Sequence, residues 1–313
     1  MAAGSSIRTS GTAKDPYSGQ VMFHRMGDDA SRDVVLFRQF TRAENPKLAT
    51  TWGPFGTLSR DGRWLVLGYW IDTKSNDLWL VDFQRFLRTG RVERREVTVG
   101  VDGIALGTVV NGALILQTTK DAPNGRVVIA RAEAPAAVGW RDLVPAREDA
   151  VIEGVSLARD AVAVTYLRNA SNIVEVFSLD GRSRGTLSQP GIGAAEVRAA
   201  EDRTDAFLTF TSFNHPTSIF HVDLANPSAP ATLWEQPEVP VDPAAVEVEQ
   251  VWYPSKDGTR VSMFLVHRKE EDRFSVSAPA GVETGTEPHI LCRVTGNESQ
   301  RSQAERSPRH GRP

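Results

Sequence analysis

The apolar residues between about positions 21 and 237 come in short runs rich in Val, Ile, Leu, Phe and Trp. Asp-Gly, Asn-Gly, Pro and Ser clusters, which are typical of turns, separate these runs. No stretch keeps a helical period for long. The pattern therefore predicts a succession of short β-strands.

Two kinds of strand recur. The first kind is nearly continuous in apolar character, which predicts burial on both faces. It is found in RDGRWLVLGYW from Arg60, VNGALILQT from Val110, ARDAVAVTYL from Ala158 and RTDAFLTFT from Arg203. The second kind alternates apolar and polar residues, which predicts one face nearer to solvent. It is found in DLWLVDF from Asp77, RVVIARA from Arg126, NIVEVFSL from Asn172 and TSIFHVDL from Thr217, so it recurs every 45 to 49 residues.

This repeat predicts the architecture. A period of about 45 to 50 residues with roughly four short strands per unit is typical of a β-propeller blade. Four full units and a partial one at residues 21–37 can be counted. We therefore predict an all-β fold, an incomplete propeller with about four to five blades, in which the beginning of the ring is missing.

The pattern changes after Pro237. A proline-rich linker is followed by apolar runs at 247–253 and 260–267, which predict a hairpin around the Lys256-Asp257-Gly258 turn. The expected organisation is a disordered start (1–16), propeller blades (17–240), a linker with the first hairpin of a second domain (241–269), and a disordered, unrelated tail (270–313). The tail is rich in Ser, Arg, Glu, Gly and Pro.

Composition narrows the function classes. The 36 basic and 39 acidic residues give a formal net charge of −3, which predicts neither a nucleic-acid nor a membrane partner. The single cysteine, Cys292, cannot form a disulfide within the chain. No secretory signal is recognisable at the start of the chain. These features predict a cytoplasmic protein.

Several segments, in order along the chain, resemble the prolyl oligopeptidase family. The segment VWYPSKDGTRVSMFLVH from Val251 is similar to the family's crossing from propeller into α/β-hydrolase domain. FLTFTSFNHPTSIFHVDL from Phe207 is similar to its last blade. LSRDGRWLVLGYW from Leu58, with NDLWLVDF from Asn76, fits an earlier blade, and VMFHRMGDDASRDVVLF from Val21 fits the blade before it.

The resemblance implies a seven-bladed-type propeller that covers a hydrolase domain and admits short peptides, which that domain cleaves after proline. It also implies that a serine, an aspartate and a histidine come from the C-terminal part of the intact relative. We therefore expect this chain to be a truncated fragment, inactive alone, with short proline-containing peptides as the partners of the intact relative. Two alternatives stay open: a propeller module that binds a peptide or protein, and a missing hydrolase domain supplied by a partner chain.

The sequence offers no convincing catalytic group. One Gly-x-Ser-x-Gly match occurs, from Gly181 to Gly185, but a nucleophile elbow needs a strand before it and a helix after it. This match follows a strand on a polar Asp-Gly turn, so it predicts a blade turn. The histidines that fall in the family-like segments, His24, His215, His221 and His267, match none of the family's catalytic positions.

No metal or cofactor is expected either, because the histidine spacings do not match known ligand patterns. A helper role is expected at the end of one buried strand. By resemblance, Tyr69, Trp70, Ile71 and Asp72 lie where the propeller faces the hydrolase pocket. We therefore predict that these four residues line the substrate site without taking part in proton transfer.

Overall fold

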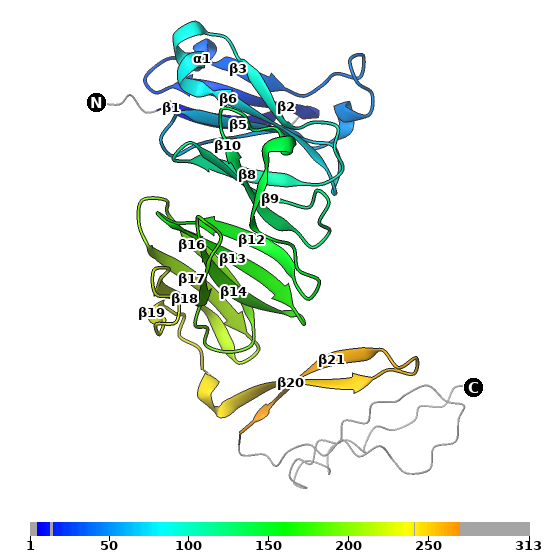
Figure 1. Ribbon diagram of the computed structural model, residues 1–313, viewed down its shortest axis with the longest axis vertical. Coiled ribbons are helices and arrows are strands. Elements are labelled where there is room, and N and C mark those ends of the chain that lie inside the picture. The colour runs from blue at the N-terminus through cyan, green and yellow to red at the C-terminus, as the bar shows by residue number, and fades with distance from the viewer. Residues whose placement is uncertain (1–4, 13–14, 241, 270–313) are drawn as a thin grey trace, which may run out of the picture. The chain divides into compact units, whose positions relative to one another are not determined.

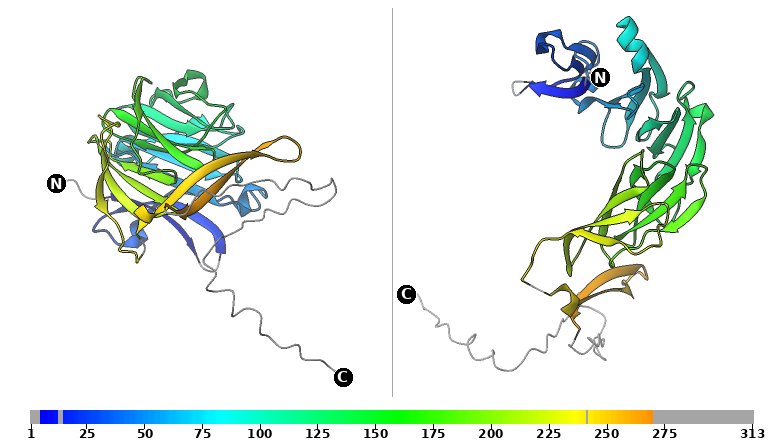
Figure 2. Two further views of the ribbon diagram at one scale, coloured as in Figure 1. Left: turned by 90° about the horizontal axis from the view of Figure 1, so that it is seen from below. Right: turned by 90° about the vertical axis from the view of Figure 1, so that its left-hand side faces the viewer.

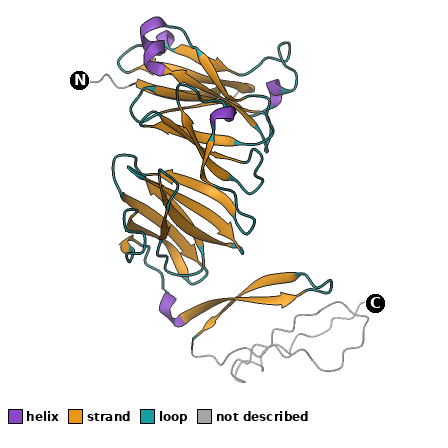
Figure 3. Cartoon of the chain, in the orientation of Figure 1, coloured by secondary structure: helices purple, strands orange, loops and turns teal. Residues whose placement is uncertain are grey.

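The computed structural model describes residues 5–12, 15–240 and 242–269. Strands make up most of this part of the chain (Figure 3). The helical segments are short, and none of those described is long and apolar enough to cross a membrane. They are α1 (Phe83–Thr89) and the 3-10 turns η1 (Ala30–Arg32), η2 (Leu48–Thr50), η3 (Ala137–Gly139) and η4 (Pro243–Ala245).

The described strands form five antiparallel sheets and one hairpin (Figure 1). Sheet I contains β1 (Ser5–Thr12), β2 (Asp15–Arg25) and β3 (Val34–Arg38). Sheet II contains β4 (Gly53–Leu58), β5 (Trp64–Trp70), β6 (Asn76–Asp82) and β7 (Arg94–Thr98). Sheet III contains β8 (Ala105–Val110), β9 (Ala113–Thr118), β10 (Arg126–Arg131) and β11 (Arg141–Val144).

The remaining strands complete the set. Sheet IV contains β12 (Val151–Leu157), β13 (Ala161–Arg168), β14 (Ser171–Ser178) and β15 (Ser183–Thr186). Sheet V contains β16 (Ala194–Ala199), β17 (Asp205–Ser212), β18 (His215–Asp223) and β19 (Thr232–Glu235). The hairpin contains β20 (Val246–Pro254) and β21 (Arg260–Arg268). Four four-stranded sheets and one of three strands confirm the predicted all-β, partial propeller.

Residues 5–12, 15 and 16 are strand residues, which differs from the disorder expected for residues 1–16. Strand β1 pairs antiparallel with β2, for example Ile7 with Phe23 and Thr9 with Val21. An edge strand is held by backbone hydrogen bonds and needs no apolar run of its own, so the apolar pattern gave no sign of it. The predicted tail at 270–313 lies outside the described residues.

Each sheet packs against the next through alternate side chains of its second strand. In β5, Leu65 and Leu67 pack against sheet I, whereas Trp64 and Val66 pack against sheet III. Residues of β9 and β13 divide in the same way between their two neighbouring sheets. Figure 2 shows sheets I to V following one another in chain order. Burial on both faces therefore explains why these strands read as continuous apolar runs.

Sheet V departs from this rule. Leu208 and Phe210 of β17 are fully buried against sheet IV. Phe207, on the opposite face, is 36% exposed and contacts the rings of His221 and Trp234. The continuous apolar pattern from Arg203 predicted burial on both faces, and this is wrong for Phe207 because no described sheet covers that face.

Buried asparagines join neighbouring sheets. Asn76, at the start of β6, accepts from the Ala105 N–H at 2.8 Å and donates to the Ala105 carbonyl oxygen at 3.0 Å. Asn172, in β14, accepts from the Ala195 N–H at 2.9 Å. Both asparagines therefore satisfy backbone groups at the first strand of the following sheet.

The predicted hairpin is confirmed at β20 and β21. In its turn, the Asp257 carboxylate accepts from the Thr259 N–H at 2.9 Å and also bonds the Ser255 hydroxyl. Gly258 adopts a φ of 84°, which glycine tolerates best. These contacts hold the pKa of Asp257 down at about 2, first of all through the Ser255 hydroxyl, so the turn keeps its charge near neutral pH.

Candidate functional site

A cavity of about 540 Å³ lies among the first strands of sheets II to V. Its lining includes Thr57 from β4, Gly107 from β8, Ser156 from β12 and Ala199 from β16. Each of these strands is terminal in its sheet, so one backbone edge has no partner strand within that sheet. The volume is in the range of pockets that hold small ligands.

Charged groups gather at one end of this cavity. Arg60, in the β4–β5 connection, and Asp202, in the β16–β17 connection, form an ion pair with Nη2 and Oδ2 2.6 Å apart. Arg159, from the β12–β13 connection, donates to the Asp202 carbonyl oxygen from Nε at 2.9 Å. Glu201 lines the cavity beside them. Burial raises the pKa of the Glu201 carboxyl group, and the Arg60 charge opposes this rise.

The hairpin of β20 and β21 contacts sheets IV and V at the strand ends opposite to the charged end of the cavity. The Gln250 side chain donates to the Asn169 carbonyl oxygen at 2.6 Å, and the Asn214 side chain donates to that of Val246 at 2.9 Å. Phe213 and Phe264 lie with their ring centroids 5.5 Å apart. These contacts involve connections between second and third strands. The equivalent connection of sheet II contains residues 71–75, directly after Tyr69 and Trp70.

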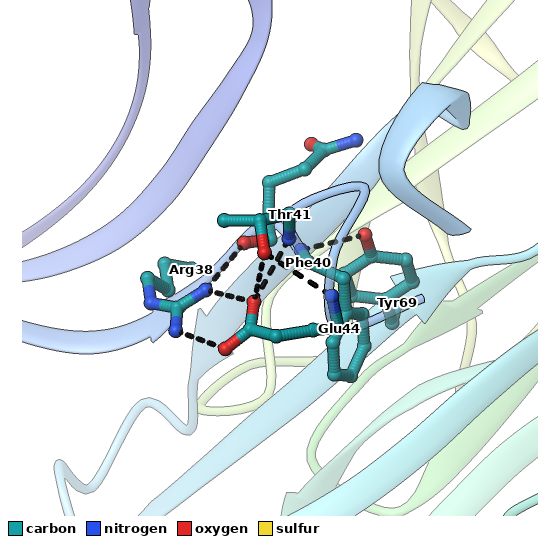
Figure 4. A network of polar contacts seen from close by, with 6 residues as sticks. Arg38, Phe40, Thr41, Glu44 and Tyr69 are labelled. Atoms are coloured by element: carbon teal, nitrogen blue, oxygen red, sulfur yellow. Dashed lines mark hydrogen bonds and ion pairs between the residues drawn. The ribbon is translucent and has the colours of Figure 1, made fainter. Parts of the chain in front are cut away.

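The sequence-predicted residues Tyr69 and Trp70 point to opposite faces of β5. Tyr69 is fully buried with the aromatic core between sheets I and II. Its hydroxyl donates to the Leu48 carbonyl oxygen at 2.9 Å. It also accepts from the Phe40 N–H at 3.2 Å (Figure 4). Tyr69 therefore fixes the 40–48 loop and offers no surface to a ligand.

A bidentate ion pair supports the same loop. Arg38 donates to both carboxylate oxygens of Glu44, at 2.8 Å and 2.6 Å (Figure 4). The Thr41 N–H donates to Glu44 at 2.9 Å. Together these contacts lower the pKa of Glu44, with the Arg38 bond as the largest cause, so this carboxylate is charged at neutral pH.

Trp70 is the sequence-predicted residue best placed to contact a ligand. Its ring is partly exposed and lies 5.4 Å from that of Phe55 and 5.9 Å from that of Trp52, which is 71% exposed. Ile71 is half-buried, and Asp72 is exposed. The Asp72 carboxylate accepts from the Lys74 N–H at 2.7 Å and the Ser75 hydroxyl at 3.0 Å. These bonds lower the pKa of Asp72 and use its oxygens to fix the turn.

The Gly-x-Ser-x-Gly match is a blade turn in the structure. Ser183 is the first residue of β15 and is followed by strand, not by a helix. Its hydroxyl accepts from the Gly185 N–H at 3.2 Å. Gly181 and Gly185 have φ angles of 91° and 119°, so the glycines serve the turn.

The described histidines have structural partners. His24 Nδ1 lies 2.6 Å from Asp33 Oδ1, and both side chains are largely buried. His215 Nδ1 lies 3.0 Å from the Pro216 carbonyl oxygen and 3.4 Å from the hydroxyl of Ser218, which is fully buried. Among the described residues, His24 is paired with a carboxylate and His215 with a carbonyl oxygen and a hydroxyl, so neither histidine joins a serine to a carboxylate.

One cluster could hold a metal ion. Glu247, Glu249 and His267 lie on one face of the hairpin, with their ligand atoms within 4.8 Å of one another. Two carboxylates and an imidazole suit Zn²⁺ or Mn²⁺. The spacing rules used on the sequence missed this set because its members meet across two paired strands. The cluster is partly exposed, and it carries no functional assignment.

Comparison with known proteins shows which family this architecture belongs to. The sequence pattern described as "Prolyl oligopeptidase, N-terminal beta-propeller domain" matches residues 5–234. The chain belongs to the prolyl oligopeptidase family. Among its relatives, the dual function macrocyclase-peptidase POPB of Amanita bisporigera is 30% identical over 87% of this chain and 37% of its own length. A prolyl endopeptidase of Elizabethkingia meningoseptica is 24% identical over 80% of this chain and 34% of its own length.

Solved structures of prolyl oligopeptidases agree. A structure from a study of two prolyl endopeptidases is 29% identical, with a TM-score of 0.71 over 85% of this chain and 38% of that protein. Apo prolyl oligopeptidase B from Galerina marginata is 25% identical, with a TM-score of 0.70 over 84% of this chain and 37% of that protein. The chain thus spans a little over a third of the length of these prolyl oligopeptidases.

Sequence reasoning missed the charged end of the cavity and the buried asparagines. Arg60 and Asp202 are 142 positions apart in sequence and sit on ordinary polar turns, so no local signal marks them. A signal for the asparagines did exist. Asn76 and Asn172 begin the apolar runs of two of the alternating strands, NDLWLVDF and NIVEVFSL.

Proposed function

We propose that this chain is the substrate-gating propeller of a prolyl oligopeptidase-like serine peptidase that cleaves short peptides after proline. The observation that carries the proposal is the 540 Å³ cavity among the first strands of four sheets, in a chain of this family. A cavity of this size suits a short extended peptide and rejects a folded protein. Prolyl oligopeptidase B from Galerina marginata has been solved bound to a 35mer substrate.

In this proposal the chain does not hydrolyse peptides by itself. Acyl transfer needs a nucleophile, a base and donors for the oxyanion, held together. The position of Ser183 at the start of β15 and the structural partners of His24 and His215 support this conclusion. The reaction belongs to a hydrolase domain, either in the same longer protein or in a partner chain. A cytoplasmic location is part of the proposal, supported by the single cysteine.

The proposal assigns Trp70, Ile71 and Asp72, which do not line the cavity, to the surface of the propeller that faces the peptide in the hydrolase pocket, with Tyr69 holding that segment from behind. Contacts of the hairpin with the equivalent connections of sheets IV and V support this placement. The partly exposed Trp70 ring, tilted by 34° against that of Phe55, offers an apolar surface suited to a proline ring.

Binding of a fluorescently labelled proline-containing peptide to the purified chain tests this assignment. Trp70→Ala should weaken binding about tenfold, since a buried aromatic contact is worth about 1–1.5 kcal/mol. Trp234→Ala is the matched control, because Trp234 is 66% exposed on the outer face of sheet V. Equal loss in both variants, or no binding to the unsubstituted chain, would contradict the proposal.

A second candidate function is a propeller module that binds a peptide or protein without any hydrolase. The outer face of sheet V favours it, since Phe207, His221 and Trp234 form an exposed aromatic group there. The same binding measurement separates the two: loss on Trp234→Ala but not on Trp70→Ala favours the module.

A further inference from the structure

The ion pair between Arg60 and Asp202 joins sheets that are not neighbours. Arg60 belongs to the β4–β5 connection of sheet II, and Asp202 to the β16–β17 connection of sheet V. Sheets III and IV lie between them in chain order, and their first strands line the same cavity. The side chains of Arg60 and Asp202 therefore reach toward each other across the end of the cavity.

The two partners are anchored differently. Asp202 is held by its own sheet and by sheet IV, because Arg203 Nε lies 3.1 Å from its Oδ1 and Arg159 of the β12–β13 connection donates to its carbonyl oxygen. The Arg60 connection is fixed to sheet II, where the Gln84 side chain of α1 donates to the Gly62 carbonyl oxygen at 2.8 Å. When the Arg60 contact breaks, the Asp202 carboxylate still has the Arg203 guanidinium as a partner. The link can open without leaving the aspartate unpaired.

Exposure makes the link weak enough to open. The Arg60 and Asp202 side chains are 51% and 46% exposed, so water and salt screen their attraction. The charged groups beside the pair include Asp61, Glu201, Arg159 and Arg203.

We propose that Arg60 and Asp202 form an ionic clasp that fixes the width of the cavity at this end and thereby limits the size of peptide admitted there. The proposal rests on the substrate-gating function above and extends it to one pair of residues. Arg60 sets the limit on size, and it touches no reacting atom.

Spin-label distance measurements test the clasp itself. Labels at Arg88→Cys in α1 and Ser228→Cys beside β18, in a Cys292→Ser background, report the separation of sheets II and V. Arg60→Gln should lengthen and broaden the distance distribution, Arg60→Lys should largely restore it, and high salt should mimic Arg60→Gln in the otherwise unsubstituted chain.

Arg63→Gln is the matched control. Arg63 lies close to Arg60 in sequence but pairs with Glu133, with 3.7 Å between Nη2 and Oε1, and does not reach sheet V. An unchanged distribution in Arg60→Gln and in high salt overturns the clasp and leaves the gating function standing.

Thiol labelling at Thr108→Cys, inside the cavity and again in a Cys292→Ser background, tests the effect on size. A maleimide coupled to a short peptide should react several-fold faster in Arg60→Gln than in the unsubstituted or Arg63→Gln background, while iodoacetamide should react equally in all three. If the peptide-coupled maleimide reacts at the same rate in all three backgrounds although the distance distribution changes, the proposal that Arg60 limits peptide size is overturned.

Discussion

Gly107 shows how closely the strands around the cavity approach one another. A Cβ atom at this position would lie 2.0 Å from the carbonyl oxygen of Ile115, on the adjacent strand β9. Backbone cannot move aside as a flexible side chain can, so only glycine fits here. Because Gly107 also lines the cavity, this close approach contributes to the shape of the cavity wall.

Gly107→Ala should therefore destabilise the protein by about 1–3 kcal/mol, the usual cost of forcing an extra carbon into a packed region. Urea unfolding measures the change. Gly191→Ala is the control, because a Cβ there meets nothing within 4 Å. Equal stability of the two variants would show that β8 and β9 are not packed as described.

Tyr166 links a single side chain to the pH dependence of stability. Its ring is fully buried between sheets III and IV, and Arg147 lies 5.0 Å from the ring centroid. Burial raises the pKa of the phenol to about 12 from its ordinary value of 10.0. The folded protein therefore keeps Tyr166 neutral at pH values where the unfolded chain ionises it.

The sign follows from this shift. Below pH 10 the phenol is protonated in both the folded and the unfolded chain, so it does not change the free energy of unfolding. Between about pH 10 and 12 the phenol ionises in the unfolded chain only, which favours unfolding. The unsubstituted chain should lose up to about 2–3 kcal/mol over that range through this group, and Tyr166→Phe should lose correspondingly less. Chemical denaturation at pH 9 and pH 11.5 measures the difference, and parallel losses in both proteins would be inconsistent with the raised pKa.

At the residue scale the sequence predicted backbone conformation better than side-chain direction. The Gly181–Gly185 match was expected to be a blade turn, and the structure has a turn there that leads into β15 at Ser183. Tyr69 was expected to line a substrate site together with Trp70. Adjacent residues of a strand point to opposite faces, so the two could not share one surface.

Between elements, the asparagine bridges are the most specific link from sheet to sheet. Hydrophobic packing alone would allow neighbouring sheets to slide, whereas the bidentate Asn76 bond fixes β6 against Ala105 of β8. Asn76 and the Ala105 side chain are both almost fully buried. The bond is therefore shielded from water and costly to lose.

Asn76→Ala should reduce the free energy of unfolding by about 1–3 kcal/mol for each backbone group of Ala105 left unpaired. Hydrogen exchange should show faster exchange of the Ala105 amide. Asn226→Ala is the control, since Asn226 is exposed and its side chain accepts only from the Ser228 hydroxyl among the described contacts. Slow Ala105 exchange in Asn76→Ala would refute the bridge.

Most elements were predictable because sheets II to IV repeat one pattern of burial. The strands β5, β9 and β13 were recognisable as continuous apolar runs, since both their faces meet another sheet. The alternating strand β6 proved to be buried on both faces except at Trp79 and Asp82, so its alternation was misread. Strand β1 carried no apolar signal, because its place depends on backbone pairing with β2.

For the whole molecule, the repeat period was the decisive feature. Four units of 45 to 49 residues became four four-stranded sheets, in an order that needed no crossover between distant strands. The cavity could not be predicted in the same way. It is built from first strands that are far apart in sequence, and its charged end joins positions 60 and 202.

The division of labour between propeller and hydrolase is the central claim. The described residues provide a peptide-sized cavity and its wall, and catalysis is assigned to a hydrolase domain. Hydrolysis of a short fluorogenic peptide with proline at the cleaved position tests this claim most directly, with the purified chain assayed beside its Ser183→Ala variant. The account predicts no turnover above background for either protein, whereas inhibitor-sensitive turnover that disappears in Ser183→Ala would contradict it.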